Sequence, residues 1–138
     1  VRMMEKIGFE VILELNYDEA VDIVTQALKA EGFGVLTEIN VKETLKKKLN
    51  EDFRPYVILG ACNPSLAHQA LSAAPEVGML LPCNVTVEAT ENGGSIVHII
   101  DPKIMMGMGS FAQNPVLSKV ADQAYEKLNR VADTLAAQ

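Results

Sequence analysis

The second half of the chain contains two alternating segments joined by a short polar stretch, and this pattern constrains the fold more than any other. Apolar and polar residues alternate along residues 80–89 and again along residues 95–101, as in strands with one buried face. Between them lies Glu-Asn-Gly-Gly, in which Asn92 and Gly93 suit a two-residue turn. The pattern predicts an antiparallel β-hairpin. Because a fully parallel, doubly wound sheet does not end in a hairpin, that fold class is excluded.

The rest of the chain alternates strands with helices. Strands are predicted over residues 6–15, 33–39 and 56–62, where apolar residues alternate or run together. Helices are predicted to begin at four asparagines that can cap a helix N-terminus, namely Asn16, Asn40, Asn63 and Asn114. The order β-α-β-α-β-α-β-β-α predicts one α+β domain over residues 1–138. It has two layers, with the two long helices covering one face of the sheet.

Charge and composition narrow the functional classes. The net charge of −6 and the pI near 4.9 oppose contact with nucleic acid phosphates, so no nucleic-acid partner is expected. Residues 42–48 contain four lysines, interpreted as the solvated side of a short helix, with an anion or partner contact as the alternative. No run of about 20 apolar residues and no basic-then-apolar leader is present, which predicts a cytoplasmic protein without membrane contact. Two cysteines are too few for a disulfide framework.

The segment Gly60–Pro64 (GACNP) joins a thiol to a predicted helix start. Asn63 suits the cap position and Pro64 the first helical position, which gives both residues a structural role. Cys62 is expected at the carboxyl end of a buried strand, facing a helix N-terminus that would stabilise a thiolate. Cys62 is therefore a candidate reactive thiol. The alternative is a small buried apolar residue, as free cysteines commonly are.

The predicted hairpin also assigns faces to the second cysteine and to a histidine. Strand alternation puts Cys83 on an apolar face and Asn84 on the other. A two-residue turn at Asn92-Gly93 pairs Asn84 with Asp101. Moving this turn along the chain to Gly93-Gly94 changes which residues pair, but each side chain stays on the same face of the sheet. His98 is then expected on the same face as Cys83, either as a ligand or as a core or interface histidine. Asn84 and Asp101 are expected together on the more polar face.

A second histidine and three methionines complete the chemically interesting residues. His68 falls outside the apolar arc of its predicted helix, so it is expected to be exposed or at the rim of a pocket. Met105, Met106 and Met108, together with the cysteines and His98, form a soft ligand set suited to Cu(I) or another thiophilic metal. The spacings match no standard metal motif. An apolar loop that packs on a partner subunit is the alternative interpretation.

Three blocks of the sequence resemble the domain-of-unknown-function family 302, namely YVILGACNPSLAHQAL, VGMLLPCNVTV and IIDPKIM. The resemblance extends over nearly the whole chain, from Phe9 to Leu135, and the MGMG part of the loop is less typical. It implies a small α+β domain of the TATA-binding-protein-like fold type, with one curved, mainly antiparallel sheet packed against helices. It also implies a homodimer. It implies no function, and likeness of fold does not imply DNA binding.

Three functional hypotheses follow from these residues. The first is a homodimeric module that binds a small ligand or a partner, in a pocket lined by Cys62, Asn63, His68, Cys83, Asn84 and Asp101. The second is a thiol-redox or soft-metal (Cu or Zn) protein that uses Cys62 and Cys83, with His98 as a further ligand. The third is an enzyme in which Asp101 or His68 acts as a general base near Asn84. The sequence identifies no cofactor, and the lack of a catalytic motif favours the first hypothesis.

Overall fold

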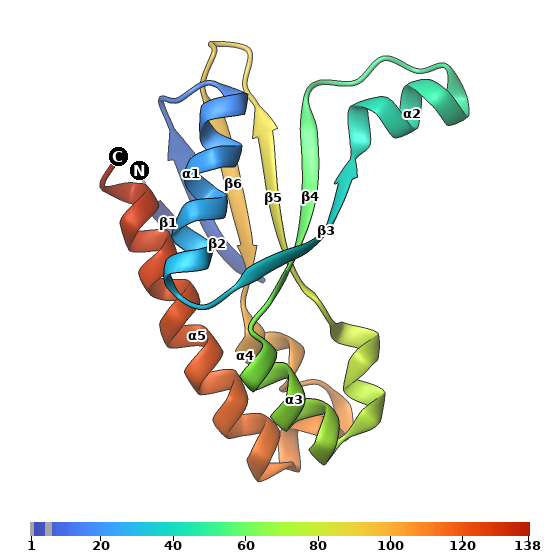
Figure 1. The fold of residues 1–138 in the computed structure, drawn as a ribbon, viewed down its shortest axis with the longest axis vertical. Helices are drawn as coiled ribbons and strands as arrows, with labels where there is room; N and C mark the ends of the chain where they lie inside the picture. The colour runs from blue at the N-terminus through green and yellow to red at the C-terminus, as the bar shows by residue number, and fades with distance from the viewer. Residues whose placement is uncertain (1, 5–6) are drawn as a thin grey trace.

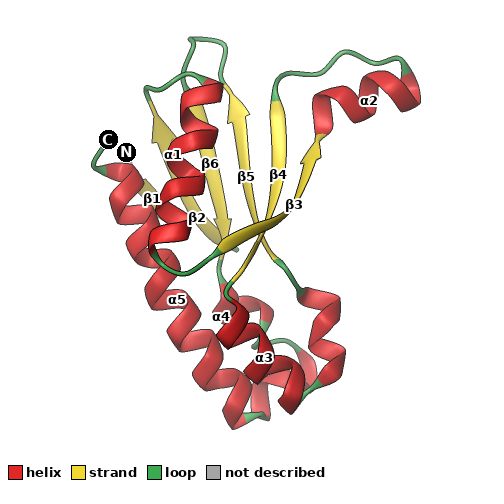
Figure 2. Cartoon of the chain, in the orientation of Figure 1, coloured by secondary structure: helices red, strands yellow, loops and turns green. Residues whose placement is uncertain are grey.

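The structure is a computed structural model that describes residues 2–4 and 7–138, and it contains a six-stranded antiparallel sheet with helices packed against it (Figures 1 and 2). The strands lie in the order β1-β2-β6-β5-β4-β3. They are β1 (Arg2–Met4), β2 (Gly8–Leu13), β3 (Gly34–Asn40), β4 (Tyr56–Cys62), β5 (Cys83–Ala89) and β6 (Ser95–Ile100). The α-helices are α1 (Tyr17–Ala30), α2 (Val41–Leu49), α3 (Pro64–Ala73), α4 (Pro102–Met105) and α5 (Pro115–Ala136), with 3-10 helices η1 (Pro75–Leu80) and η2 (Gly109–Gln113). The predicted α+β class, a mainly antiparallel sheet packed against helices, is confirmed.

The structure adds short elements to the predicted order. Residues 101–113, predicted as a loop, contain α4 and η2, and β1 was not predicted. The strand predicted over residues 80–89 begins at Cys83, because Pro82 has no N–H to donate to a neighbouring strand. Lys6, at the start of the first predicted strand, lies outside the described residues.

The hydrophobic core lies between the sheet and the two long helices, α1 and α5 (Figure 2). Alternate strand residues point toward these helices and are fully buried, among them Phe9 on β2 and Val97 on β6. Leu28 from α1 and Leu128 from α5 close the core from the helical side. We call this side of the sheet the covered face. The prediction that the two long helices cover one face of the sheet, made from the helical periodicity of their apolar residues, therefore agrees with the structure.

The β5–β6 hairpin differs in register from the predicted one. Thr86 pairs with His98, and the Thr90 N–H donates a 3.0 Å hydrogen bond to the Gly94 carbonyl, which leaves three residues in the loop. Gly93 adopts a positive φ of 85°, a conformation that glycine reaches without steric cost. Three-residue loops with glycine at this position are a common hairpin type. A loop of odd length shifts the pairing by one residue and moves side chains to the opposite face.

This register corrects two predictions. Cys83 is buried on the covered face and His98 lies on the opposite face, so the prediction that they share a face is wrong. The register also removes the predicted pairing of Asn84 with Asp101. We call the second side of the sheet the open face, because α1 and α5 do not cover it. Its residues include Gly8, Glu10, Ile12, Thr37, Ile39, Tyr56, Ile58, Gly60, Asn84, Thr86, Glu88, Ile96, His98 and Ile100.

At one edge of the sheet, β3 and α2 form a wing, residues 34–49, in which β3 pairs with β4 and α2 projects from the sheet (Figure 1). None of these residues, all of them described, is buried. Leu36 is 67% exposed, and Leu49 at the end of α2 is 64% exposed. The predicted apolar stripe of α2 therefore has no core to pack on, and the wing adds little to the burial of apolar area.

The four predicted helix caps are confirmed, because each asparagine side chain accepts a hydrogen bond from a backbone N–H in the first turn. The donors are Glu19 for Asn16, Glu43 for Asn40, Leu66 for Asn63, and both Val116 and Leu117 for Asn114. Within the described chain, no helix has the length and apolar character that crossing a bilayer requires.

Candidate functional site

The two cysteines lie on neighbouring strands and line one small cavity. Cys83 is directly opposite Ala61, the residue that precedes Cys62. The cavity beside them has a volume of about 30 Å³ and is otherwise walled mainly by apolar side chains, such as Phe33 and Met106. Such a volume holds about one water molecule. Three of the six predicted lining residues, Cys62, Asn63 and Cys83, therefore meet, but the space between them does not admit a ligand.

Burial makes both thiols less acidic. It raises the pKa of Cys83 from 9.0 to about 11, with a further contribution from the nearby Cys62. Burial also raises the pKa of Cys62. The expectation that the helix N-terminus would favour a Cys62 thiolate is therefore not met, because desolvation acts in the opposite direction and Pro64 removes one donor N–H. Both cysteines are free thiols.

His98, the third candidate metal ligand, is on the other side of the sheet from Cys83. Its Nε2 lies 3.1 Å from a carboxylate oxygen of Glu10, the residue directly opposite on β2. The structure therefore separates His98 from Cys83, whereas Cys62 and Cys83 line one cavity. Over the described residues, no three His, Cys, Asp or Glu side chains gather as a metal site would require.

The remaining candidates are dispersed. The Asp101 carboxylate is 5% exposed and caps α4 by accepting a 2.8 Å hydrogen bond from the Lys103 N–H, which is a structural role. Asn84 is exposed on the open face, and His68 is exposed on α3, as expected for the latter. The arrangement proposed for the enzyme hypothesis, with Asp101 or His68 as a base beside Asn84, is therefore not assembled in this structure.

A larger cleft lies on the other side of Asn63, between the start of α3 and the middle of α5. Its volume is about 440 Å³, within the usual range for small-molecule sites. In contrast to the cysteine cavity, its walls are mostly polar. The lining residues are Asn63, Ser65, Leu66 and Gln69 from α3, and Gln123, Glu126, Lys127 and Arg130 from α5. Of the six predicted pocket residues, only Asn63 lines this cleft.

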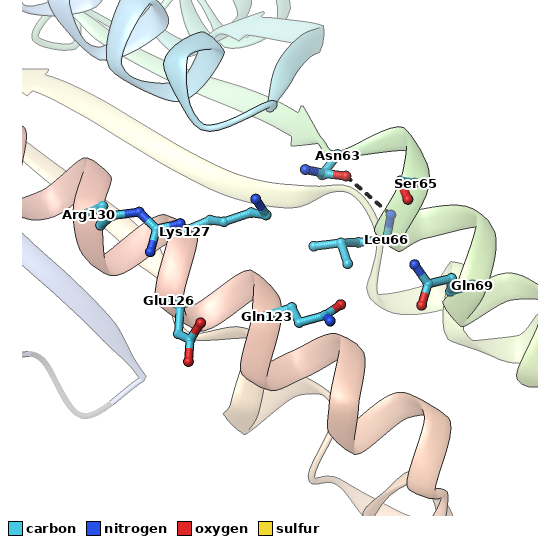
Figure 3. Close-up of a pocket in the computed structure, with 8 residues that line it drawn as sticks. All are labelled: Asn63, Ser65, Leu66, Gln69, Gln123, Glu126, Lys127 and Arg130. Atoms are coloured by element: carbon cyan, nitrogen blue, oxygen red, sulfur yellow. Dashed lines mark hydrogen bonds between the residues drawn. The ribbon is translucent and has the colours of Figure 1, made fainter.

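Hydrogen-bond donors dominate the walls of the cleft. Figure 3 shows Lys127 reaching from α5 toward α3, with Gln69 and Gln123 facing one another across the gap. Glu126, the acidic residue of the lining, points away from α3 (Figure 3). Arg130 donates from Nε to Glu31 at 2.9 Å, which offsets part of its charge. The cleft therefore presents amide and cationic donors to a bound molecule.

The local sequence explains why Asn63 can serve both the helix and the cleft. Its side-chain oxygen accepts from the Leu66 N–H at 3.2 Å, which leaves its amide nitrogen as a donor. That nitrogen lies against Gly32, where an added Cβ would be 3.0 Å away. Gly32 also has a positive φ of 82° at the end of α1. Glycine is therefore favoured at position 32 for two reasons: it adopts a positive φ without strain, and it has no Cβ to crowd the Asn63 side chain.

Sequence reasoning missed the half of the cleft that α5 provides, although a signal was present. Gln123, Lys127 and Arg130 recur at intervals of four and three residues, so they lie on one side of the helix. This polar row borders the buried stripe that includes Ala124 and Leu128. A polar row beside a core stripe is typical of any surface helix, so only the position of α3 makes it part of a site.

The fold and the cleft define a class of protein: a small α+β protein with an antiparallel sheet, one helix-covered face and a polar cleft between α3 and α5. Residues 9–135 match the family described as "Domain of unknown function DUF302". An uncharacterised conserved protein DUF302 from Bacillus stearothermophilus, known from a crystal structure, has 32% sequence identity to this chain. The two structures superpose with a TM-score of 0.82. The match covers 95% of this chain and 99% of the other. No curated protein matches this sequence.

The chain belongs to the DUF302 family, since the match spans nearly all of its length and a solved relative shares its fold. The predicted family resemblance is thereby confirmed. Because the family has no established function, the function has to be argued from the chain's own residues.

Proposed function

We propose that the predicted single domain, residues 1–138, is a homodimeric binding module that takes a small anionic molecule in the cleft between α3 and α5. The observation that carries the proposal is the cleft of about 440 Å³, whose facing walls present Lys127 and side-chain amides. Among the described residues, Lys127 has no ion-pair partner, so its charge is available to a ligand. A carboxylate or phosphate group satisfies such donors.

The same geometry favours binding over chemistry. Gln69 and Gln123 can orient a ligand by hydrogen bonds, but amides neither donate nor accept protons as acids and bases at neutral pH. A cytoplasmic location remains part of the proposal, because Cys62 and Cys83 are free thiols of the kind that a reducing compartment maintains.

Thermal denaturation with defined probes tests the ligand site. The probes are inorganic phosphate and succinate, with succinamide as the uncharged counterpart. A probe present at about ten times its Kd stabilises the folded state by about 1.4 kcal/mol, which raises the unfolding midpoint by about 4 °C. We expect one of the anions to raise the midpoint and succinamide to leave it unchanged.

Lys127→Gln removes the charge of the cleft while keeping a side chain of similar shape. We expect this variant to lose most of the midpoint increase. Lys119→Gln is the matched control, because Lys119 is exposed on the same helix but does not line the cleft. Equal losses in the two variants, or no response of the wild-type protein to either anion, would contradict an anion site in this cleft.

A further inference from the structure

The open face and the wing leave apolar side chains uncovered on both sides of β5, whose own open-face residues, Asn84, Thr86 and Glu88, are polar. Ile12 on β2 is 42% exposed and Ile39 on β3 is 49% exposed, with three more isoleucines half-buried between them on β4 and β6. On the wing, Leu36 and Leu49 are exposed to a greater degree. Apolar side chains gathered on a face that the chain leaves uncovered, with polar residues among them, are typical of an interaction surface.

Two features of the open face indicate a surface that another molecule completes. The Thr86 hydroxyl is buried without a hydrogen-bond partner in the described part of the chain. Beside it, a hollow of about 380 Å³ opens on the face, bordered by Ile7, Gly8, His98 and Ile100. Ile7 at its rim is 61% exposed. A protruding side chain of a partner would fill such a hollow.

The distribution of charge identifies the partner. Helix α2 carries four lysines and one glutamate, a net charge of +3, so the rest of the chain carries −9 of the total of −6. Lys46 pairs with Asp52 of the same chain, whereas Lys47 and Lys48 are exposed. A basic wing on an acidic body is complementary to a second copy of itself.

We propose that the open face and the wing form the interface of a homodimer, in which two sheets pack face to face. A two-fold axis parallel to the strands places the β3 edge and α2 of each copy over the β1–β2 edge of the other, at the end of the sheet where Glu14 is exposed. An axis perpendicular to the strands would instead stack β3 on β3 and place each α2 at the opposite end of the other copy's sheet, away from Glu14. This inference rests on the homodimer half of the proposed function and specifies its surface.

The area of the surface supports the participation of the wing. Five strands spaced by about 4.8 Å, each about 20 Å long, give the open face a footprint of about 500 Å². Stable interfaces bury about 800 Å² on each partner. The five strands alone therefore fall short, and α2 supplies the difference. The dimer gives a role to α2, none of whose residues is buried within its own chain.

Sedimentation equilibrium of the purified full chain tests the interface with two variants. Ile39→Glu places a charge at the junction of sheet and wing, and we expect the dimer dissociation constant to rise at least about 30-fold, as for a central interface contact. Lys47→Glu combined with Lys48→Glu should raise it about tenfold. For the wild-type dimer, affinity should fall between about 0.1 M and about 1 M salt, as the screening length drops from about 10 Å to about 3 Å.

Matched controls separate the interface from general effects. Val116→Glu introduces the same charge at an apolar residue of similar exposure on α5, and Lys29→Glu with Lys119→Glu changes the net charge as the wing variant does. Both controls should remain dimeric, and circular dichroism should show every variant folded. A monomeric wild-type protein overturns the homodimer and its surface together. If the Ile39 and wing variants remain dimeric, or if the controls lose the same affinity, this surface is wrong although the homodimer stands. The ligand site is tested separately, by the binding of phosphate and succinate at Lys127.

Discussion

The two faces of the sheet are made by the same strands but use their residues differently. On β4, Leu59 points to the covered face and is 1% exposed, while its neighbour Ile58 points to the open face and is half-buried. The first belongs to a core closed by α1 and α5, and the second has only its strand neighbours. The comparison teaches that two aliphatic side chains at neighbouring positions can have different roles. Leu59 stabilises its own chain, whereas Ile58 is available for contact with another chain. Four predictions test this difference, from the largest expected effect to the smallest.

Leu59→Ala and Ile58→Ala compare the two faces directly. Leu59→Ala should lower the free energy of unfolding by about 3 kcal/mol, because it removes buried methyl groups and leaves a cavity in the core. Ile58→Ala should cost under about 1 kcal/mol in dilute solution. Urea denaturation measures both. If a second copy covers the open face, the cost of Ile58→Ala increases with protein concentration. Equal costs for the two variants at low concentration would contradict the division into faces.

The buried thiol of the covered face should make stability fall in alkali. The pKa of Cys83 is about 11 in the folded chain against 9.0 for a free thiol, so the unfolded chain releases its proton first as the pH rises. The associated stability is fully present below pH 9 and is lost progressively up to about pH 11, where the loss reaches about 2.7 kcal/mol. Other groups titrate in this range, so the measurement is the difference between the wild-type protein and Cys83→Ala. Parallel pH profiles for the two proteins would contradict the shift.

Gly60→Ala tests a place where the open face is tightly packed. An added Cβ would lie 2.1 Å from the Thr37 hydroxyl oxygen and 2.7 Å from the ring of Pro82. We expect a loss of about 2 kcal/mol in the free energy of unfolding, since overpacking forces both neighbours to move. Gly34→Ala is the matched control on β3, because its added Cβ would meet no atom within 4 Å. Similar urea midpoints for the two variants would show that this contact yields easily.

Asn63→Ala and Asn40→Ala compare the same type of cap on α3 and on the wing. Loss of the Asn63 cap should cost about 1 kcal/mol in global unfolding, because α3 packs on the core through Leu66 and Ala70. Asn40→Ala should fray α2 with almost no global effect, since no residue of α2 is buried. Amide hydrogen exchange distinguishes the two outcomes. A global loss from Asn40→Ala would show that the wing is coupled to the core within one chain.

The sequence predicted the fold in detail where local chemistry determines it. The four asparagine caps, the alternation along β5 and β6, and the apolar stripe of α5 all follow from short-range preferences. The face of His98 was predicted wrongly, because it depends on whether the hairpin loop contains two or three residues. Asn-Gly-Gly is compatible with both loop lengths, so a single local choice reversed every side chain on one strand relative to the other.

The candidate site was less predictable than the fold. Chemical interest centred on Cys62, Cys83 and His98, the residue types that most often carry reactions. The structure buries one thiol, raises the pKa of both and places the histidine on the other face. The cleft instead uses Gln69, Gln123 and Lys127, which are ordinary surface residues until two helices distant in sequence face each other.

The sequence by itself determined the class of fold, the helix starts and the family, because capping, alternation and helical periodicity are local and each element records its own pattern. Only the tertiary structure decided which residues meet. It placed Asn63 and Lys127 in one cleft, separated Cys83 from His98, and left α2 outside the core. The physical reason is that a site is defined by distances between elements far apart in the chain, and those distances depend on register and packing.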